Sequence, residues 1–174
     1  MPLPELDLAA FEGVPFPVAH RAELARKGSL AVEGMGRKLL VVWNDGDPRV
    51  FADQCAHMGL PLSMGRVRKG RLTCAYHGWS YRADDGAVVE QPALRKPHPC
   101  SLERFGCLTH GDLVFAWTGD PGARAEAAAM LPETPPRGIS LHRVVYDCPF
   151  YLVLFNAVDY AHFCLLYTSP SPRD

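Results

Sequence analysis

Two short segments, each with one cysteine and one histidine, constrain this chain more than any other feature. The first is Cys55-Ala56-His57, and Cys74-Ala75-Tyr76-His77 follows after sixteen intervening residues. Thiolates and imidazoles are common protein ligands of transition metals, so the two pairs indicate a metal centre held by two loops. The alternative, four core residues that bind nothing, would require two matched segments to arise by accident.

Mixed cysteine and histidine ligation fits either a tetrahedral zinc ion or a [2Fe–2S] cluster in which two histidines replace two cysteines on one iron. Zinc sites more often pair two cysteines in one loop and two histidines in another. A two-iron cluster needs each loop to reach both irons, and one Cys plus one His per loop does this. Gly59 and Gly78 stand just after the ligands, where backbone N–H groups can then approach the sulfur atoms closely.

The pattern from Gly13 to about Trp117 predicts short strands separated by turns. Arg37–Asn44 is a good strand candidate, and the turn Asp45-Gly46-Asp47-Pro48 joins it to Arg49–Asp53 as a hairpin partner. In this part only Arg21–Arg26 has a helical pattern. Further strand candidates are Arg71–Cys74, Ser80–Ala83, Ala87–Glu90 and Leu113–Trp117. Many short strands with regular turns favour an all-β sandwich or a small barrel.

Charge and composition narrow the possible partners and compartment. The net charge of −1 over 174 residues gives no reason to expect a nucleic-acid or membrane partner. No segment reaches the roughly 18 apolar residues of a membrane span, and the acidic N-terminus lacks the features of a secretory signal. We therefore expect a cytoplasmic protein whose cysteines are metal ligands or buried thiols. Cys100, Cys107 and Cys148 have no ligand-like spacing and are interpreted as buried thiols.

A second group of polar residues lies near the C-terminus. Pro149 suits the first turn of a helix running to about Phe163, and Asn156, Asp159 and His162 are spaced by three residues along it. Steps of three residues place these side chains within about 120° of one helix face. On spacing alone, a helix whose polar side chains cap or pair locally explains them at least as well as a functional site.

The two loops carry a resemblance to a known family. Cys55–Leu62 (CAHMGLPL) and Cys74–Trp79 (CAYHGW) resemble the cluster-binding loops of Rieske domains in ring-hydroxylating oxygenases and Rieske ferredoxins. The resemblance implies a Rieske [2Fe–2S] cluster bound by Cys55, His57, Cys74 and His77. It also implies a mostly β fold, a Rieske-type antiparallel β-sandwich with two cluster-binding loops.

High-potential Rieske proteins resemble this layout but have an extra cysteine in each loop, forming a disulfide, and a serine after the second glycine. Here Leu60, Tyr76 and Trp79 occupy those positions. We therefore expect no loop disulfide and no hydroxyl donor to a sulfur. Fewer donors stabilise the reduced cluster less, so we predict a potential at the low end of the Rieske range, roughly −150 mV.

The order of the segments resembles the catalytic α subunit of Rieske non-haem iron oxygenases, in which a helix reading N-x₂-D-x₂-H-x₄-H follows a connector. By this resemblance His162 would be the first histidine of a two-His, one-carboxylate Fe(II) site, and Asp159 would link that iron to the cluster of a neighbouring subunit. Asn156 would lie near the iron. The pattern departs at the second histidine, where this chain has Tyr167, and the carboxylate ligand would come much later.

The last eleven residues do not continue the helix pattern. Cys164–Asp174 (CLLYTSPSPRD) can be encoded by a string that resembles a transposase-type sequencing adapter. We therefore expect the genuine product to continue differently after Phe163. A real Ser/Pro-rich disordered tail is the alternative.

The resemblance and the adapter match together predict four parts: a Rieske domain at 13–118, a connector with one short helix at 119–140, the first strand and helix of an incomplete α+β catalytic domain at 141–163, and an adapter-derived tail at 164–174. A ferredoxin or NAD(P)H-dependent flavin reductase would supply electrons, and the full-length protein would be a homotrimer oxidising a small apolar substrate. This chain alone would be inactive, because its mononuclear iron site is incomplete. The alternatives are a Rieske ferredoxin without oxygenase activity and a zinc-binding module.

Overall fold

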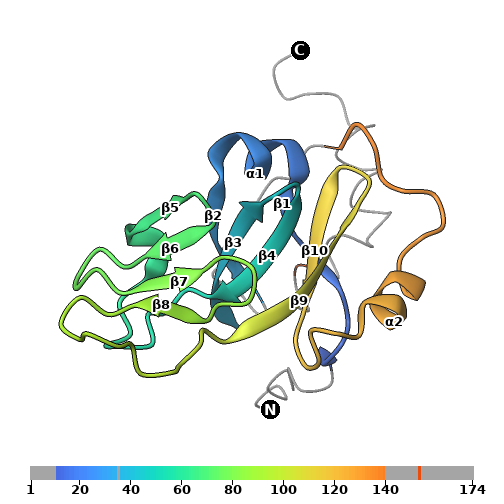
Figure 1. Cartoon of the computed structure of the whole chain (residues 1–174). Helices are drawn as coiled ribbons and strands as arrows, with labels where there is room; N and C mark the ends of the chain where they lie inside the picture. The colour runs from blue at the N-terminus through green and yellow to red at the C-terminus, as the bar shows by residue number, and fades with distance from the viewer. Residues whose placement is uncertain (1–10, 35, 140–152, 154–174) are drawn as a thin grey trace, which may run out of the picture. The chain divides into compact units, whose positions relative to one another are not determined.

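The computed structural model describes residues 11–34, 36–139 and 153. Apart from Val153, these residues belong to one compact unit within Met1–Leu141 (Figure 1). Its elements are β1 (Phe16–His20), α1 (Arg21–Lys27), β2 (Ser29–Gly34), β3 (Arg37–Asn44), β4 (Asp47–Ala52), η2 (Leu62–Met64), β5 (Arg66–Arg68), β6 (Arg71–Thr73), β7 (Ser80–Arg82), β8 (Val88–Glu90), β9 (Arg104–His110), β10 (Leu113–Trp117) and α2 (Arg124–Ala129).

The larger sheet has six antiparallel strands in the order β1-β10-β9-β4-β3-β2. Strand β3 is apolar on both faces because both of its faces are covered. Leu39 and Val41 pack in one core cluster, with side chains from β1, β9 and β10, whereas Leu40 and Val42 pack in a second cluster with Phe51. An uninterrupted apolar run is the pattern expected of a strand that is buried on both sides.

The smaller sheet has four antiparallel strands in the order β5-β6-β7-β8. Leu72 and Tyr81 are directly opposite one another on β6 and β7, and both are fully buried in the cluster that contains Leu40 and Val42. The smaller sheet therefore packs on the face of the larger sheet that carries Leu40, Val42 and Phe51. This arrangement confirms the mostly β, antiparallel fold that the sequence predicts.

Tight turns fix the register of two hairpins. Asp45-Gly46 connects β3 to β4 with φ of 48° and 86°, and Lys69-Gly70 connects β5 to β6 with φ of 50° and 69°. Positive φ at both central residues characterises the type I′ turn, whose twist matches that of paired strands. The hairpin predicted between Arg37–Asn44 and Arg49–Asp53 is confirmed, with β4 beginning two residues earlier, at Asp47.

Both short helices expected before residue 140 are present, as α1 and α2. No helix in the described ranges has the length and apolar character that crossing a bilayer requires. The strand predicted at Leu141–Asp147 lies outside the described residues, as does the helix predicted from Pro149 to Phe163 apart from Val153.

Candidate metal centre

The two loops that carry the predicted ligands close in the same way. The N–H of Cys55 donates to the carbonyl oxygen of Leu60 at 2.9 Å, and the N–H of Gly59 donates back to the carbonyl oxygen of Cys55 at 2.9 Å. In the second loop, the N–H of Cys74 donates to Trp79 at 2.8 Å and that of Gly78 donates to Cys74 at 3.2 Å. The sequence thus builds two matching loops of the same length.

Gly59 and Gly78 occupy equivalent positions, four residues after the cysteine of each loop. Their φ values are 73° and 70°, a conformation that side chains with a Cβ rarely adopt. These glycines are therefore required by the backbone itself, a reason separate from close approach to the sulfur atoms.

The two cysteines form the inner part of the site. Cys55 is 3% exposed and Cys74 is 4% exposed. Burial raises the pKa of the Cys74 thiol, and the neighbouring Cys55 raises it further, while the N–H groups of Tyr76 and His77 act in the opposite direction. Both cysteines are thus shielded from solvent.

The two histidines form the outer part of the site, and both are exposed. The ring centroids of His57 and His77 lie 4.7 Å apart. Trp79 stacks on His57 with a centroid distance of 4.5 Å and an interplanar angle of 6°, and Tyr76 lies against His77 at 3.8 Å. An aromatic neighbour therefore limits the orientation of each imidazole.

This donor set fits a mixed-ligand two-iron cluster. Within residues 11–34, 36–139 and 153, no group of three or more His, Cys, Asp or Glu side chains is placed to hold a metal ion. The four predicted ligands are two buried cysteines and two exposed histidines. A cluster with two cysteines on one iron and two histidines on the other needs this division.

The structure corrects one expectation, that no hydroxyl reaches a sulfur. The Tyr81 hydroxyl lies 3.1 Å from Cys55 Sγ and accepts a hydrogen bond from the N–H of Ala56 at 3.2 Å. The expectation was wrong because it considered only the loop residues, whereas Tyr81 reaches the sulfur from strand β7. Its signal in the sequence is its place in a strand two residues after Trp79, where alternation turns the side chain toward the core.

Two further polar contacts hold the ends of the loops, and the sequence analysis missed both. Asp53, just before the first loop, accepts hydrogen bonds from the N–H of Ser63 at 2.7 Å and from its hydroxyl at 2.5 Å. At the base of the second loop, the hydroxyls of Thr73 and Ser80 lie 3.0 Å apart. Each loop is thus fixed by its own backbone bonds and by one contact between side chains at its ends.

The second predicted site lies outside the described residues. Asp159 and His162, with the neighbouring Asn156, stay predictions from the resemblance. Among the other cysteines, Cys100 and Cys107 are only partly buried, and Cys148 also lies outside the described residues.

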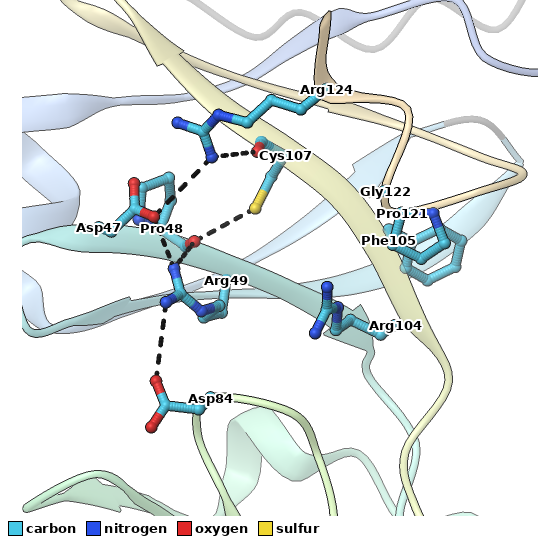
Figure 2. Close-up of a pocket in the computed structure, with 10 residues that line it drawn as sticks. All are labelled: Asp47, Pro48, Arg49, Asp84, Arg104, Phe105, Cys107, Pro121, Gly122 and Arg124. Atoms are coloured by element: carbon cyan, nitrogen blue, oxygen red, sulfur yellow. Dashed lines mark hydrogen bonds and ion pairs between the residues drawn. The ribbon is translucent and has the colours of Figure 1, made fainter.

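A separate pocket of about 320 Å³ contains none of the predicted site residues (Figure 2). Arg49 binds Asp47 at 2.8 Å and approaches Asp84 at 3.7 Å, so its charge is used within the fold. The Cys107 thiol donates to the carbonyl oxygen of Pro48 at 3.2 Å. Burial, with Asp47 nearby, raises the pKa of Cys107 to about 11, so this thiol stays protonated at neutral pH.

Comparison with known proteins decides the family. A family model described as the Rieske [2Fe-2S] domain matches residues 14–110, more than half of the chain. The chain belongs to the Rieske [2Fe–2S] domain family. Its cofactor is accordingly an iron–sulfur cluster. The match contains both loops and all four predicted ligands.

Curated relatives of this Rieske domain include oxygenases. Chlorophyllide a oxygenase from Chlamydomonas reinhardtii is 30% identical over 164 residues, covering 91% of this chain and 25% of the relative. The terminal oxygenase of carbazole 1,9a-dioxygenase from Novosphingobium sp. KA1 superposes with a TM-score of 0.57 at 32% identity, covering 63% of this chain and 31% of that one. A complex of carbazole-bound oxygenase with ferredoxin superposes with a TM-score of 0.56 at 27% identity, covering 63% of this chain and 30% of that one.

The chain spans between 20% and 40% of the length of the curated relatives it matches. It corresponds to the N-terminal, Rieske part of oxygenase α subunits.

Proposed function

We propose that this chain is the electron-accepting Rieske domain of a terminal oxygenase, and that Cys55, His57, Cys74 and His77 bind its cluster. The observation that supports this most is the pair of matching loops, each of which carries one buried cysteine and one exposed histidine. When bound, the cluster accepts and releases single electrons. Exposure of His57 and His77 leaves that side of the site open to a redox partner.

The residues around the ligands have separate tasks in this proposal. Tyr81 donates a hydrogen bond to the Cys55 sulfur, and Trp79 holds the plane of the His57 ring. Asp53 and the Thr73–Ser80 pair fix the loop ends. Fixed ligands and donors limit the rearrangement that accompanies electron transfer, because neighbouring groups both orient metal ligands and tune the metal.

In the full-length protein, His162 would bind a mononuclear Fe(II), and Asp159 would connect that site to the cluster of the next subunit in a homotrimer. A ferredoxin or an NAD(P)H-dependent flavin reductase would supply the electrons. The known complex of a related oxygenase with ferredoxin supports the ferredoxin route. The reaction would be O₂-dependent hydroxylation or demethylation of a small apolar substrate, in the cytoplasm. The 174-residue chain alone would not turn over, since only one of three Fe(II) ligands is present.

Sequencing the source DNA past codon 163 tests the oxygenase part of this proposal. We expect a histidine codon five positions after His162, followed by a long open frame with a late Asp or Glu codon. The full-length protein, supplied with reductase and NAD(P)H, should consume O₂ with substrate, whereas the 174-residue chain should not. Reads that confirm CLLYTSPSPRD and a stop would overturn this part, and the chain would then be a Rieske ferredoxin-type electron carrier.

A further inference from the structure

The sheet β5–β8 carries three arginines that face one another across its strands. Arg68 on β5 lies directly opposite Arg71 on β6, and Arg71 lies directly opposite Arg82 on β7. All three are exposed, while Leu72 and Tyr81 beside them turn into the core. Like charges at directly opposed positions destabilise a sheet. These three residues, called the arginine row below, are therefore unfavourable for the stability of the sheet.

Protection of a sheet edge does not explain the arginine row. Charged residues on an edge strand prevent unwanted pairing with other chains, and β5 is an edge strand. Arg71 and Arg82, however, lie on β6 and β7, which pair on both sides. The row therefore crosses from β5 to β7 instead of following the edge of the sheet.

Neighbouring acids compensate only part of this charge. Arg71 lies 3.5 Å from Glu90 and Arg82 lies 3.3 Å from Asp85, with more than 45% of each of these side chains exposed. Such ion pairs are weak because water and salt screen them. Within the described part of the chain, Arg68 forms no ion pair. Residues 54–98 contain seven Lys and Arg against three Asp and Glu, a net +4 in a chain of net −1.

The arginine row lies at the end of strands β5–β7 away from the cluster loops, about one short strand from them. Arg71 precedes Cys74 by three residues, which is roughly 10 Å along a strand. That separation exceeds the Debye length of about 8 Å at physiological ionic strength but is well within the roughly 30 Å at 0.01 M salt, so the field of the row reaches the loops at low salt. At the loops themselves, Met58 and Tyr76 are 67% and 61% exposed. Large apolar side chains that are exposed on such loops are typical of a surface that a protein partner covers.

We propose that the arginine row is the docking surface for an acidic electron-donor protein, which brings the donor's reduced centre near the cluster loops. This inference rests on the proposed electron-accepting function and adds where the donor binds and which charge it carries. One electron passes from the donor's reduced iron–sulfur centre to the oxidised cluster, and no covalent bond forms. Complementary charge acts mainly on the rate of encounter, so the effect should depend steeply on salt.

The test measures reduction of the cluster-loaded chain by two reductants in stopped flow. The first is an acidic plant-type [2Fe–2S] ferredoxin, which is a stronger reductant than Rieske centres. The second is a small uncharged photoreduced deazaflavin. Reversing two charges of the row, Arg68→Glu with Arg71→Glu, should slow reduction by ferredoxin roughly tenfold or more at low salt and flatten its salt dependence. Reduction by deazaflavin should not change.

Two control variants keep the result interpretable. Arg26→Glu, on exposed helix α1, makes the same kind of charge change away from the loops and should leave both rates unchanged. The double variant Arg68→Gln with Arg71→Gln removes the like-charge contact, so it should fold at least as well as the parent. It should still slow reduction of the cluster by ferredoxin severalfold.

A parent rate that does not fall with salt would overturn the docking surface, and so would equal slowing by Arg26→Glu. Failure of deazaflavin to reduce any cluster would instead refute the electron-accepting function itself.

Discussion

Replacing Tyr81 by phenylalanine removes one oxygen atom, which is also the acceptor of the Ala56 N–H, and keeps the buried ring. Tyr81 is fully buried, and its hydroxyl lies 3.1 Å from Cys55 Sγ. Once the Cys55 sulfur binds iron it has no proton, so the Tyr81 hydroxyl must donate the hydrogen bond between them. Burial, with Cys55 nearby, raises the pKa of Tyr81 well above its ordinary value, so the donor proton is present at every working pH.

The size of the effect follows from the change in charge on reduction. A hydrogen bond to a charged acceptor contributes about 2 kcal/mol and one to a neutral acceptor about 1 kcal/mol, so the reduced, more negative cluster gains about 1 kcal/mol more from Tyr81. For a one-electron couple this difference is roughly 40 mV. Loss of the donor destabilises the reduced state, so Tyr81→Phe should lower the midpoint potential by that order.

The assay is a spectroelectrochemical titration of the cluster-loaded chain. Tyr76→Phe is the matched control, because Tyr76 is a tyrosine of the second loop that is 61% exposed and whose hydroxyl makes no hydrogen bond to a sulfur in the described residues. It should leave the potential unchanged. An unchanged or higher potential in Tyr81→Phe, with the cluster content retained, would refute the assignment of Tyr81 as a donor.

Three other predictions concern the fold and its thiols. Gly106→Ala should destabilise the chain by about 1–3 kcal/mol in chemical denaturation, since its Cβ would lie 2.0 Å from the buried Trp117 ring; a loss below about 0.5 kcal/mol would show that the ring can move. Asp53→Ala should leave the fold intact but speed loss of iron to a chelator, because Ser63 loses its acceptor at the end of the first loop; equal rates would exclude Asp53 as a loop anchor. Cys107, whose pKa is raised to about 11, should react with iodoacetamide more slowly than an ordinary thiol at pH 8, and faster as the pH approaches 11; mass spectrometry showing rapid labelling at pH 8 would contradict the raised pKa.

The sequence predicted the parts of this fold that depend on local pattern. The apolar run of β3, the Asp45-Gly46 turn and the two Cys/His loops are each recognisable within about ten residues, and the structure places them as expected. The pairing of β1 with β10, which are about a hundred residues apart, leaves no such local mark.

The same difference applies to the site. The four predicted ligands lie within their own short motifs, whereas Tyr81 and Asp53 act through contacts made by packing. Tyr81 reaches Cys55 across 26 positions of sequence, and Asp53 reaches Ser63 across ten. A potential predicted from the loops alone therefore left out a hydrogen-bond donor supplied by a neighbouring strand.

The central claim is that Cys55, His57, Cys74 and His77 hold a two-iron cluster, and metal and sulfide analysis combined with nitrogen-resolved electron paramagnetic resonance tests it most directly. For the chain purified without air, the account predicts two irons and two acid-labile sulfides per chain, with two imidazole nitrogens coupled to the reduced centre. His77→Cys should remove one of those nitrogens. A single zinc ion with no sulfide, or a reduced centre coupled to no nitrogen, would contradict the account.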